Sequence, residues 1–183
     1  MDLKIVLPDT AYLLELKKIA QSFKDNPTPF DIYHMDQIVQ ALDQDDFDNY
    51  FSMAENYRGT NIPKGRVPCS FLWIMSADKI VAIADIRHTL NDYLRHVCGG
   101  HIAYEVVPEY RGKGLMNPIG KLLLKYARDN FGIKEALITC HIENTASYKV
   151  ISRLMREMGG KEETDTLVDN HIEKRFWVTT GLD

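Results

Sequence analysis

The feature that most limits how this chain can fold is a strand-like segment that passes through a glycine-containing turn directly into an amphipathic helix. Residues 101–107 (HIAYEVV) have the β-branched and aromatic character of a strand, and Pro108 closes them. Residues 115–130 carry apolar side chains at helical spacing, and Gly132 lies just beyond them. The run therefore predicts a strand, a tight turn and a helix in immediate succession.

The turn itself has the composition of an anion-binding site. The first turn of a helix leaves backbone N–H groups unpaired, and the helix dipole adds partial positive charge there. Gly112 and Gly114 would let an anion approach the backbone, while Arg111 and Lys113 add full positive charge. These residues favour a phosphate or pyrophosphate site. From the turn alone, an ordinary strand-to-helix connection that happens to use glycine fits equally well.

Two other phosphate-binding motifs do not match the sequence. A P-loop needs a Gly-Lys pair followed by Ser or Thr, and the chain has none. A dinucleotide-binding GxGxxG motif would need a third glycine at Asn117, and it would normally open the chain rather than follow several helices and strands. A nucleotide-binding module is therefore disfavoured.

The other segments predict one α/β domain over residues 1–183. The apolar pattern alternates between strand and helix periods, with Pro and Gly at the boundaries. We expect a mixed, α+β-like central sheet of about seven strands flanked by about four helices. The expected strands are 2–6, 69–76, 79–88, 101–107, 136–140, 161–168 and 174–178; the expected helices follow Asp9 or Thr10, span 35–57 and 115–130, and span 144–158.

Charge and cysteine content narrow the class of protein. The formal net charge of −4 argues against a nucleic-acid binder, which would normally carry a basic face. Cys69, Cys98 and Cys140 form no CxxC pair, so no metal site is expected. No apolar run is long enough for a membrane span, and the start of the chain lacks a signal-peptide pattern. We expect a cytoplasmic protein that binds neither nucleic acid nor membrane; a homodimer remains open.

The turn and several other segments resemble the GCN5-related N-acetyltransferase (GNAT) superfamily. Residues 111–116 (RGKGLM) match its R/Q-x-x-G-x-G/A motif except at the last position, where Met116 replaces Gly or Ala. Residues 137–140 (LITC), followed by 144–147 (NTAS), resemble its second cofactor motif. Residues 86–94, 99–102 and 175–178 are similar to one predicted-acetyltransferase subgroup. The resemblance covers the chain from about residue 70 to its end, and the order of elements agrees with that fold.

This resemblance implies a site for acetyl-CoA as co-substrate, without a metal. The loop amides would bind the CoA pyrophosphate, the backbone of the preceding strand would pair with the pantetheine arm, and the second motif would hold that arm from the other side. If Met116 points at the pyrophosphate, binding should be weaker. The implied cofactor-binding residues are Val106, Val107, Arg111, Gly112, Lys113, Gly114, Leu115, Met116, Asn144 and Ser147.

The catalytic groups are less defined. Transfer from a thioester to an amine needs a deprotonated amine and a proton for the departing thiolate. The superfamily often uses a Tyr about seven residues after the Asn, but Ile151 stands there. Tyr148, about one turn earlier, is a candidate acid, although it could simply pack. Glu105 and His101, on one face of the strand, are candidate bases acting through water.

The resemblance predicts an acetyl-CoA-dependent N-acetyltransferase, with direct attack by a primary amine in a ternary complex. A non-catalytic acyl-CoA-binding or regulatory protein is the alternative, because of Ile151. Polyamine, amino acid, aminoglycoside-like drug and protein N-terminus all remain as acceptors. Residues 1–65 carry eleven acidic against six basic residues, concentrated at 43–48. Such a surface would attract a cationic acceptor, or it is simply a solvated helix face.

Overall fold

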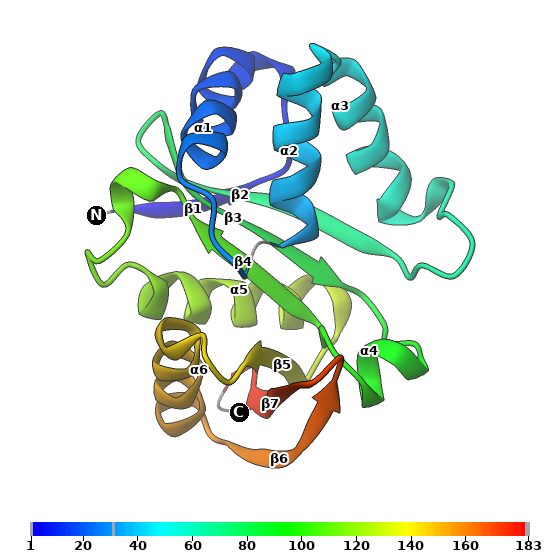
Figure 1. Cartoon of the computed structure of the whole chain (residues 1–183), viewed down its shortest axis with the longest axis vertical. Helices are drawn as coiled ribbons and strands as arrows, with labels where there is room; N and C mark the ends of the chain where they lie inside the picture. The colour runs from blue at the N-terminus through cyan, green and yellow to red at the C-terminus, as the bar shows by residue number, and fades with distance from the viewer. Residues whose placement is uncertain (1, 31, 182–183) are drawn as a thin grey trace. The chain divides into compact units, whose positions relative to one another are not determined.

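The seven strands of the computed structural model, which describes residues 2–30 and 32–181, lie in two sheets (Figure 1). The described chain falls into two compact units. The first unit comprises Met1–Asp85 and Tyr104–Leu115, and the second comprises Ile86–Ala103 and Met116–Asp183. The mixed α/β class is confirmed. The single domain over 1–183 stays a prediction.

The first sheet has the strand order β1-β2-β3-β4. Strand β1 pairs antiparallel with β2, with Leu3 opposite Ser76, and a two-residue turn at Ala77 and Asp78 joins β2 to β3 as the sequence predicts. Both β2 and β3 are buried along nearly their whole length, which explains their continuous apolar composition. The bounds are β1 Leu3–Val6, β2 Cys69–Ser76, β3 Lys79–Arg87 and β4 Ile102–Val106.

Three helices of the first unit share one hydrophobic core with strands β2 and β3. Helix α1 (Leu13–Asp25) follows a short 3₁₀ turn, Thr10–Tyr12, that Asp9 caps by accepting a hydrogen bond from the Ala11 N–H. Helices α2 (Tyr33–Gln44) and α3 (Phe47–Glu55) come next, and a π-turn, Asn56–Thr60, continues α3. The buried residues of α1 form one apolar stripe, Leu16, Ile19, Ala20 and Phe23, while Leu13 at its start is only partly buried.

The single helix expected over 35–57 is wrong, because the chain breaks between α2 and α3. Asp45 adopts a left-handed conformation with φ of 48° and ends α2. Asp46 then caps α3, its Oδ1 accepting from the Asn49 N–H at 3.0 Å. A left-handed residue cannot continue an α-helix, and a cap at the next position starts a new one.

A hydrogen-bonded network crosses the core of the first unit. His34 on α2 is fully buried, and its Nδ1 donates to the carbonyl oxygen of Ala84 at 3.0 Å. Its Nε2 accepts from the Tyr50 hydroxyl at 2.8 Å, and the Trp73 indole N–H donates to that hydroxyl oxygen at 3.1 Å. Burial lowers the pKa of His34 to about 3, so the imidazole is neutral.

The second sheet has the order β5-β7-β6, with both pairs antiparallel. The strands expected over 161–168 and 174–178 are confirmed as β6 and β7, which pair as an antiparallel hairpin. Helices α5 and α6 match the two expected helices within a residue or two, and a short helix that the sequence did not predict, α4, begins at its Asn91 cap. The bounds are α4 Asp92–His96, α5 Met116–Phe131, β5 Glu135–His141, α6 Thr145–Met158, β6 Gly160–Val168 and β7 His171–Thr179.

One continuous central sheet was expected, and an imidazole explains why the strands divide into two. Gly100 forms an isolated bridge to Ile138, and a Cβ at Gly100 would lie only 2.3 Å from the Leu137 carbonyl oxygen. One residue later, the Leu137 N–H donates to His101 Nδ1 at 2.9 Å instead of to a backbone carbonyl. The backbone ladder therefore stops after a single bridge.

None of the helices within residues 2–30 and 32–181 combines the length and the hydropathy that a membrane span requires.

Candidate functional site

The glycine turn adopts the open conformation that an anion site needs. Gly112 and Gly114 both have φ of 72°, in the left-handed region where other residues are strained. Both are exposed, and nothing lies within 4 Å of where a Cβ would stand. A 3₁₀ turn, Pro108–Tyr110, precedes the loop, and α5 begins at Met116 immediately after it. The unpaired N–H groups of the first turn of α5 thus directly follow the two glycines.

The guanidinium of Arg111 points back along its own strand. Its Nε donates to the Val106 carbonyl oxygen at 3.1 Å, and its Nη2 lies 3.0 Å from Oε1 of Glu105. That Nη2 is shielded from solvent. The second cation of the loop, Lys113, is exposed and places its Nζ 5.2 Å from the centre of the Tyr110 ring. The two cations therefore differ, with Arg111 engaged by β4 and Lys113 presented at the surface.

The two strand residues expected to contact the cofactor direct their backbone groups differently. The Val107 N–H donates to the Val81 carbonyl oxygen at 3.1 Å, and the Val107 carbonyl accepts from the Tyr110 N–H at 2.8 Å. The Val106 carbonyl instead accepts from the Arg111 side chain. Neighbouring strand residues direct their backbone groups to opposite sides, so Val106 is the residue whose carbonyl is turned away from β3.

His101 is held neutral by burial, with its lone pair already in use. Burial, together with the nearby charges of Arg87 and Arg95, lowers its pKa to about 4. Because Nδ1 accepts from the Leu137 N–H, the proton of the neutral ring resides on Nε2. A general base needs an available lone pair, so this geometry favours Glu105 over His101 as the candidate base.

The start of α6 brings Asn144 and Ser147 together. Asn144 is the cap residue, and its Oδ1 accepts from the Ser147 N–H at 3.0 Å. The next residue, Tyr148, is 37% exposed; its ring contacts Phe176 edge to face at 5.7 Å, and Lys174 Nζ lies 6.0 Å from its centre. Ile151, at the position of the usual tyrosine, is completely buried.

A buried carboxylate on β7 was missed by the sequence analysis. Glu173 is 5% exposed, and its Oε1 accepts from the Thr139 hydroxyl at 2.5 Å and from the Cys98 thiol at 3.6 Å. Burial, together with the Glu173 charge, raises the pKa of Cys98 to about 11 and that of Cys140 to about 12. Both thiols are therefore protonated and unreactive at neutral pH. The alternation of β7 could have revealed that Glu173 shares an inward face with Arg175.

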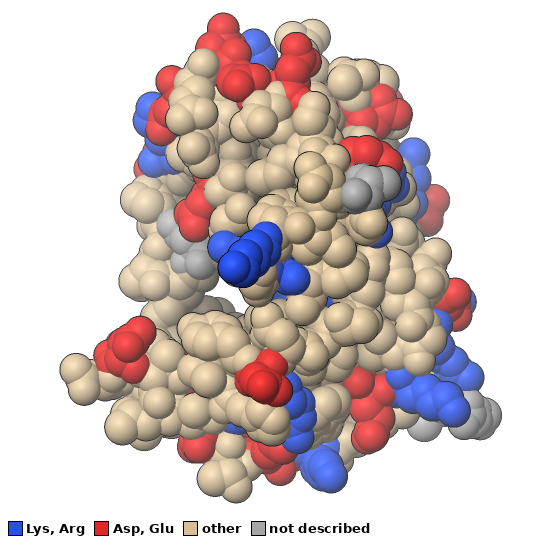
Figure 2. All heavy atoms as spheres, turned by 90° about the vertical axis from the view of Figure 1, so that its right-hand side faces the viewer, with Lys and Arg blue, Asp and Glu red and all other residues tan. Residues whose placement is uncertain are grey.

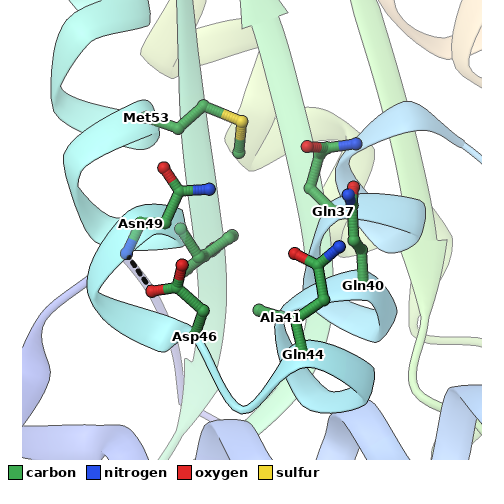
Figure 3. Close-up of a pocket in the computed structure, with 8 residues that line it drawn as sticks. Gln37, Gln40, Ala41, Gln44, Asp46, Asn49 and Met53 are labelled. Carbon is green, nitrogen blue, oxygen red and sulfur yellow. Dashed lines mark hydrogen bonds between the residues drawn. The ribbon is translucent and has the colours of Figure 1, made fainter.

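The acidic residues of the first unit have local partners. Asp43 accepts from Lys24 Nζ at 2.6 Å and Asp45 from Lys17 Nζ at 3.3 Å, while Asp46 caps α3. Figure 2 shows acidic side chains next to basic ones at the top of the view, the end where α2 and α3 join in Figure 1. A shallow depression between these helices is drawn in Figure 3, lined by Gln37, Gln40, Ala41, Gln44, Asp46, Asn49, Tyr50 and Met53.

In the part of the chain that the structure describes, no three His, Cys, Asp or Glu side chains gather as metal ligands would.

Comparisons with known proteins agree on one family. A family model described as an acetyltransferase (GNAT) domain matches residues 17–154. A search of curated protein sequences found no significant match.

The similar solved structures are acetyltransferases of low sequence identity. RimJ of Mycobacterium smegmatis, in complex with a CoA disulfide, is 16% identical with a TM-score of 0.68 over 97% of this chain and 81% of its own. RimL, a ribosomal L7/L12 alpha-N-protein acetyltransferase in complex with coenzyme A, is 14% identical with a TM-score of 0.67 over 97% and 93%. Spermidine N-acetyltransferase of Vibrio cholerae, in complex with CoA and spermine, is 11% identical with a TM-score of 0.61 over 97% and 95%. At these identities the likeness shows the fold alone.

Proposed function

The chain belongs to the acetyltransferase (GNAT) family, and on that premise we propose that it transfers an acetyl group from acetyl-CoA to a primary amine. Attack would be direct, within a ternary complex of the protein, acetyl-CoA and the amine. The observation that carries the proposal is the loop of Gly112 and Gly114, open at both glycines and leading straight into the first turn of α5. Such a combination is suited to the pyrophosphate of a CoA thioester.

The cofactor contacts are proposed from the same geometry. The backbone N–H groups from Arg111 to Met116 would bind the pyrophosphate. Val106 would pair with the pantetheine arm more readily than Val107, because the Val106 carbonyl is turned away from β3 and has a second lone pair besides the one that Arg111 Nε engages, whereas Val107 bonds to the backbone of Val81 and Tyr110. Asn144 and Ser147 would hold that arm at the start of α6. Acetyl-CoA supplies the activated thioester, so no metal is needed for the transfer.

The chain's own groups would handle the two protons. Glu105, 17% exposed in its side chain, is the proposed base that takes a proton from the incoming amine through water. Tyr148 is the proposed acid for the departing thiolate, since its ring is anchored on Phe176 and its side chain is partly exposed. His101 would instead stay neutral and link the residue before β4 to Leu137 through a hydrogen bond.

The acceptor is proposed only as a primary amine. RimL is named for a protein N-terminus and the Vibrio cholerae enzyme for spermidine, so both macromolecular and small acceptors occur among the similar folds. A cationic acceptor is supported by the acidic excess of residues 1–65. The ion pairs of Asp43 and Asp45 reduce the charge that is left to attract it.

One observation favours a second candidate, a non-catalytic acyl-CoA binder. Ile151 is part of the core, so the usual acid is replaced by an apolar side chain that cannot reach solvent. Measuring CoA release from acetyl-CoA with a panel of polyamines, amino acids, aminoglycosides and peptides separates the two. Release that depends on one class of amine supports the transferase. Tight acetyl-CoA binding without release for any amine would support the binder.

A further inference from the structure

We propose that Arg111 is a positioning residue for the Glu105 carboxylate and that Lys113 alone supplies the side-chain charge that binds the cofactor's pyrophosphate. The inference rests on the proposed function and deepens it. By its place in the loop motif, Arg111 would be assigned to the pyrophosphate together with Lys113. The contacts of the two side chains separate them.

The first step is the set of contacts that the Arg111 guanidinium makes. Nε donates a hydrogen bond to the Val106 carbonyl at 3.1 Å, and Nη2 forms an ion pair with Glu105 Oε1 at 3.0 Å without hydrogen-bond geometry, so one planar group contacts the backbone and the side chain of consecutive residues. A guanidinium holds such a pair of contacts in a fixed geometry, whereas an ammonium acts as a point charge. The Glu105 side chain thereby acquires a defined position relative to the end of β4.

The second step is exposure. The Nη2 atom of Arg111 is shielded from solvent, although its side chain as a whole is 32% exposed, and the Glu105 side chain is 17% exposed. The guanidinium nitrogen that faces Glu105 is therefore not the part of Arg111 that an incoming anion would meet. The Lys113 side chain is exposed on the loop between the two glycines, with its Nζ 5.2 Å from the Tyr110 ring centre. An ammonium over an aromatic face near the surface is held weakly and can move to a phosphate.

The third step is the consequence for the reaction. If the pantetheine arm pairs with the β4 edge at Val106, the Arg111 contact with the Val106 carbonyl places the guanidinium beside that arm. Loss of Arg111 would remove the ion pair that holds Glu105 Oε1, so proton removal from the amine would suffer more than cofactor binding.

The test compares Arg111→Gln and Lys113→Gln, which remove one charge each from the same loop. Calorimetric titration with CoA should give a Kd for Arg111→Gln within about threefold of wild type, and a Kd for Lys113→Gln raised about tenfold, the usual size of a lost charge-assisted contact. Arg111→Gln should instead lower kcat at least tenfold with little change in the KM for acetyl-CoA.

A double-mutant cycle connects Arg111 to Glu105 rather than to general stability. Glu105→Gln should lower kcat by about 10², and adding Arg111→Gln to it should cause little further loss, because the residue that Arg111 positions is already disabled. Arg111→Lys should recover only part of the kcat, since it cannot hold both partners at once. If Arg111→Gln does not fold, Arg111→Met removes the same charge while keeping a long unbranched side chain, and it carries the same comparison.

Two results would overturn the inference. One is a Kd for CoA that rises as much in Arg111→Gln as in Lys113→Gln, which makes Arg111 a cofactor ligand. The other is full additivity of Arg111→Gln and Glu105→Gln in kcat. If the wild type binds CoA but acetylates no amine, the proposed transferase activity fails, whereas the Kd comparison still decides the division of charge between Arg111 and Lys113.

Discussion

Single residues of α6 decide whether the protein has a built-in acid. Ile151 lies in the core, so in the proposed transfer another group must supply the proton for the thiolate. Tyr148 is on the preceding turn, and its ring rests on Phe176 with more than a third of the side chain exposed. A phenol held this way can both pack and donate.

We therefore expect Tyr148→Phe to lower kcat about 10²-fold while the affinity for acetyl-CoA barely changes, because only the hydroxyl is lost. Steady-state kinetics at saturating acetyl-CoA measure this. Tyr126→Phe, the same chemical change on α5, is the matched control and should be neutral. A Tyr148→Phe enzyme within about threefold of wild type would show that the ring only packs.

Asn144 has two roles that two substitutions can separate. Its Oδ1 caps α6 through the Ser147 N–H, and its amide N–H₂ is proposed to contact the pantetheine arm. Asn144→Ala should cost about 1 kcal/mol of stability through the lost cap, whereas Asn144→Asp keeps a good cap. Both should raise the KM for acetyl-CoA several-fold to tenfold, since both lose the donor. Thermal melts and kinetics of both variants test this, and an unchanged KM would remove Asn144 from the site.

At the scale of elements, the loop and the helix that follows it form the proposed site for the cofactor's pyrophosphate. Gly114 and Gly132 stand just before and just after α5, with φ of 72° and 66° and open space at both. Glutamate at either position should be strained to a similar degree. Only the one beside the first turn of α5 puts a negative charge where the pyrophosphate would bind.

We expect acetyl-CoA at a hundredfold excess over Kd to stabilise the wild type by about 2.7 kcal/mol and to raise its Tm. Gly114→Glu should abolish that rise, and Gly132→Glu should keep it despite a similar loss of intrinsic stability. Differential scanning fluorimetry with and without acetyl-CoA makes the comparison. A preserved rise in Gly114→Glu would remove the loop from the cofactor site.

Elements with a strong local pattern could be predicted from the sequence, and those set by distant contacts could not. Helix α5, the β6–β7 hairpin and the cap at Asn144 follow from periodicity, glycine and capping residues close to each other in the chain. The division into two sheets depends on His101, whose imidazole takes the Leu137 N–H from a strand thirty-six residues away. The break at Asp45 does leave a trace in the sequence, because the five-residue gap between Leu42 and Phe47 departs from helical spacing and Asp46 is a capping residue type.

The same contrast holds for the candidate site. The proximity of Asn144 and Ser147 could be predicted because residues three apart meet at a helix start. The direction of the Arg111 guanidinium could not be predicted, because it depends on the Glu105 carboxylate and the Val106 carbonyl at the end of β4. A motif assigns backbone geometry well, but the partner of a long cationic side chain is fixed only when the strand beside it is placed.

For the whole molecule, two buried histidines contribute to the loss of stability in acid. His34 and His101 have pKa values lowered by burial to about 3 and about 4, whereas an unfolded histidine has a pKa near 6.5. The unfolded chain therefore binds more protons than the folded one below pH 6.5, so stability is full above that pH and falls as the pH drops toward the folded pKa values. At pH 5 each histidine should lower the free energy of unfolding by roughly 2 kcal/mol.

Urea unfolding between pH 7 and pH 5 measures this loss. His34→Gln should be less stable at pH 7, because the bonds to Ala84 and Tyr50 are disturbed, but it should lose less on acidification than the wild type. His96→Gln, which changes an exposed histidine, should leave the slope unaltered. A wild-type midpoint that does not move between pH 7 and pH 5 would contradict the assignment.

Each compact unit contains one tryptophan, which can serve as its fluorescent reporter. The chain has two tryptophans; Trp73 donates to Tyr50 in the first unit, and Trp177 lies under the Arg95 guanidinium, 4.9 Å away, in the second. Trp177→Phe and Trp73→Phe therefore leave tryptophan emission from one unit at a time.

Strands β3 and β4 each run through residues of both units, so neither unit can unfold without disrupting a strand of the other. We expect the emission of each variant to change at the same urea concentration as its far-ultraviolet circular dichroism, as cooperative unfolding of one domain requires. Emission from either tryptophan that changes well before the circular dichroism would divide residues 1–183 into two folding units.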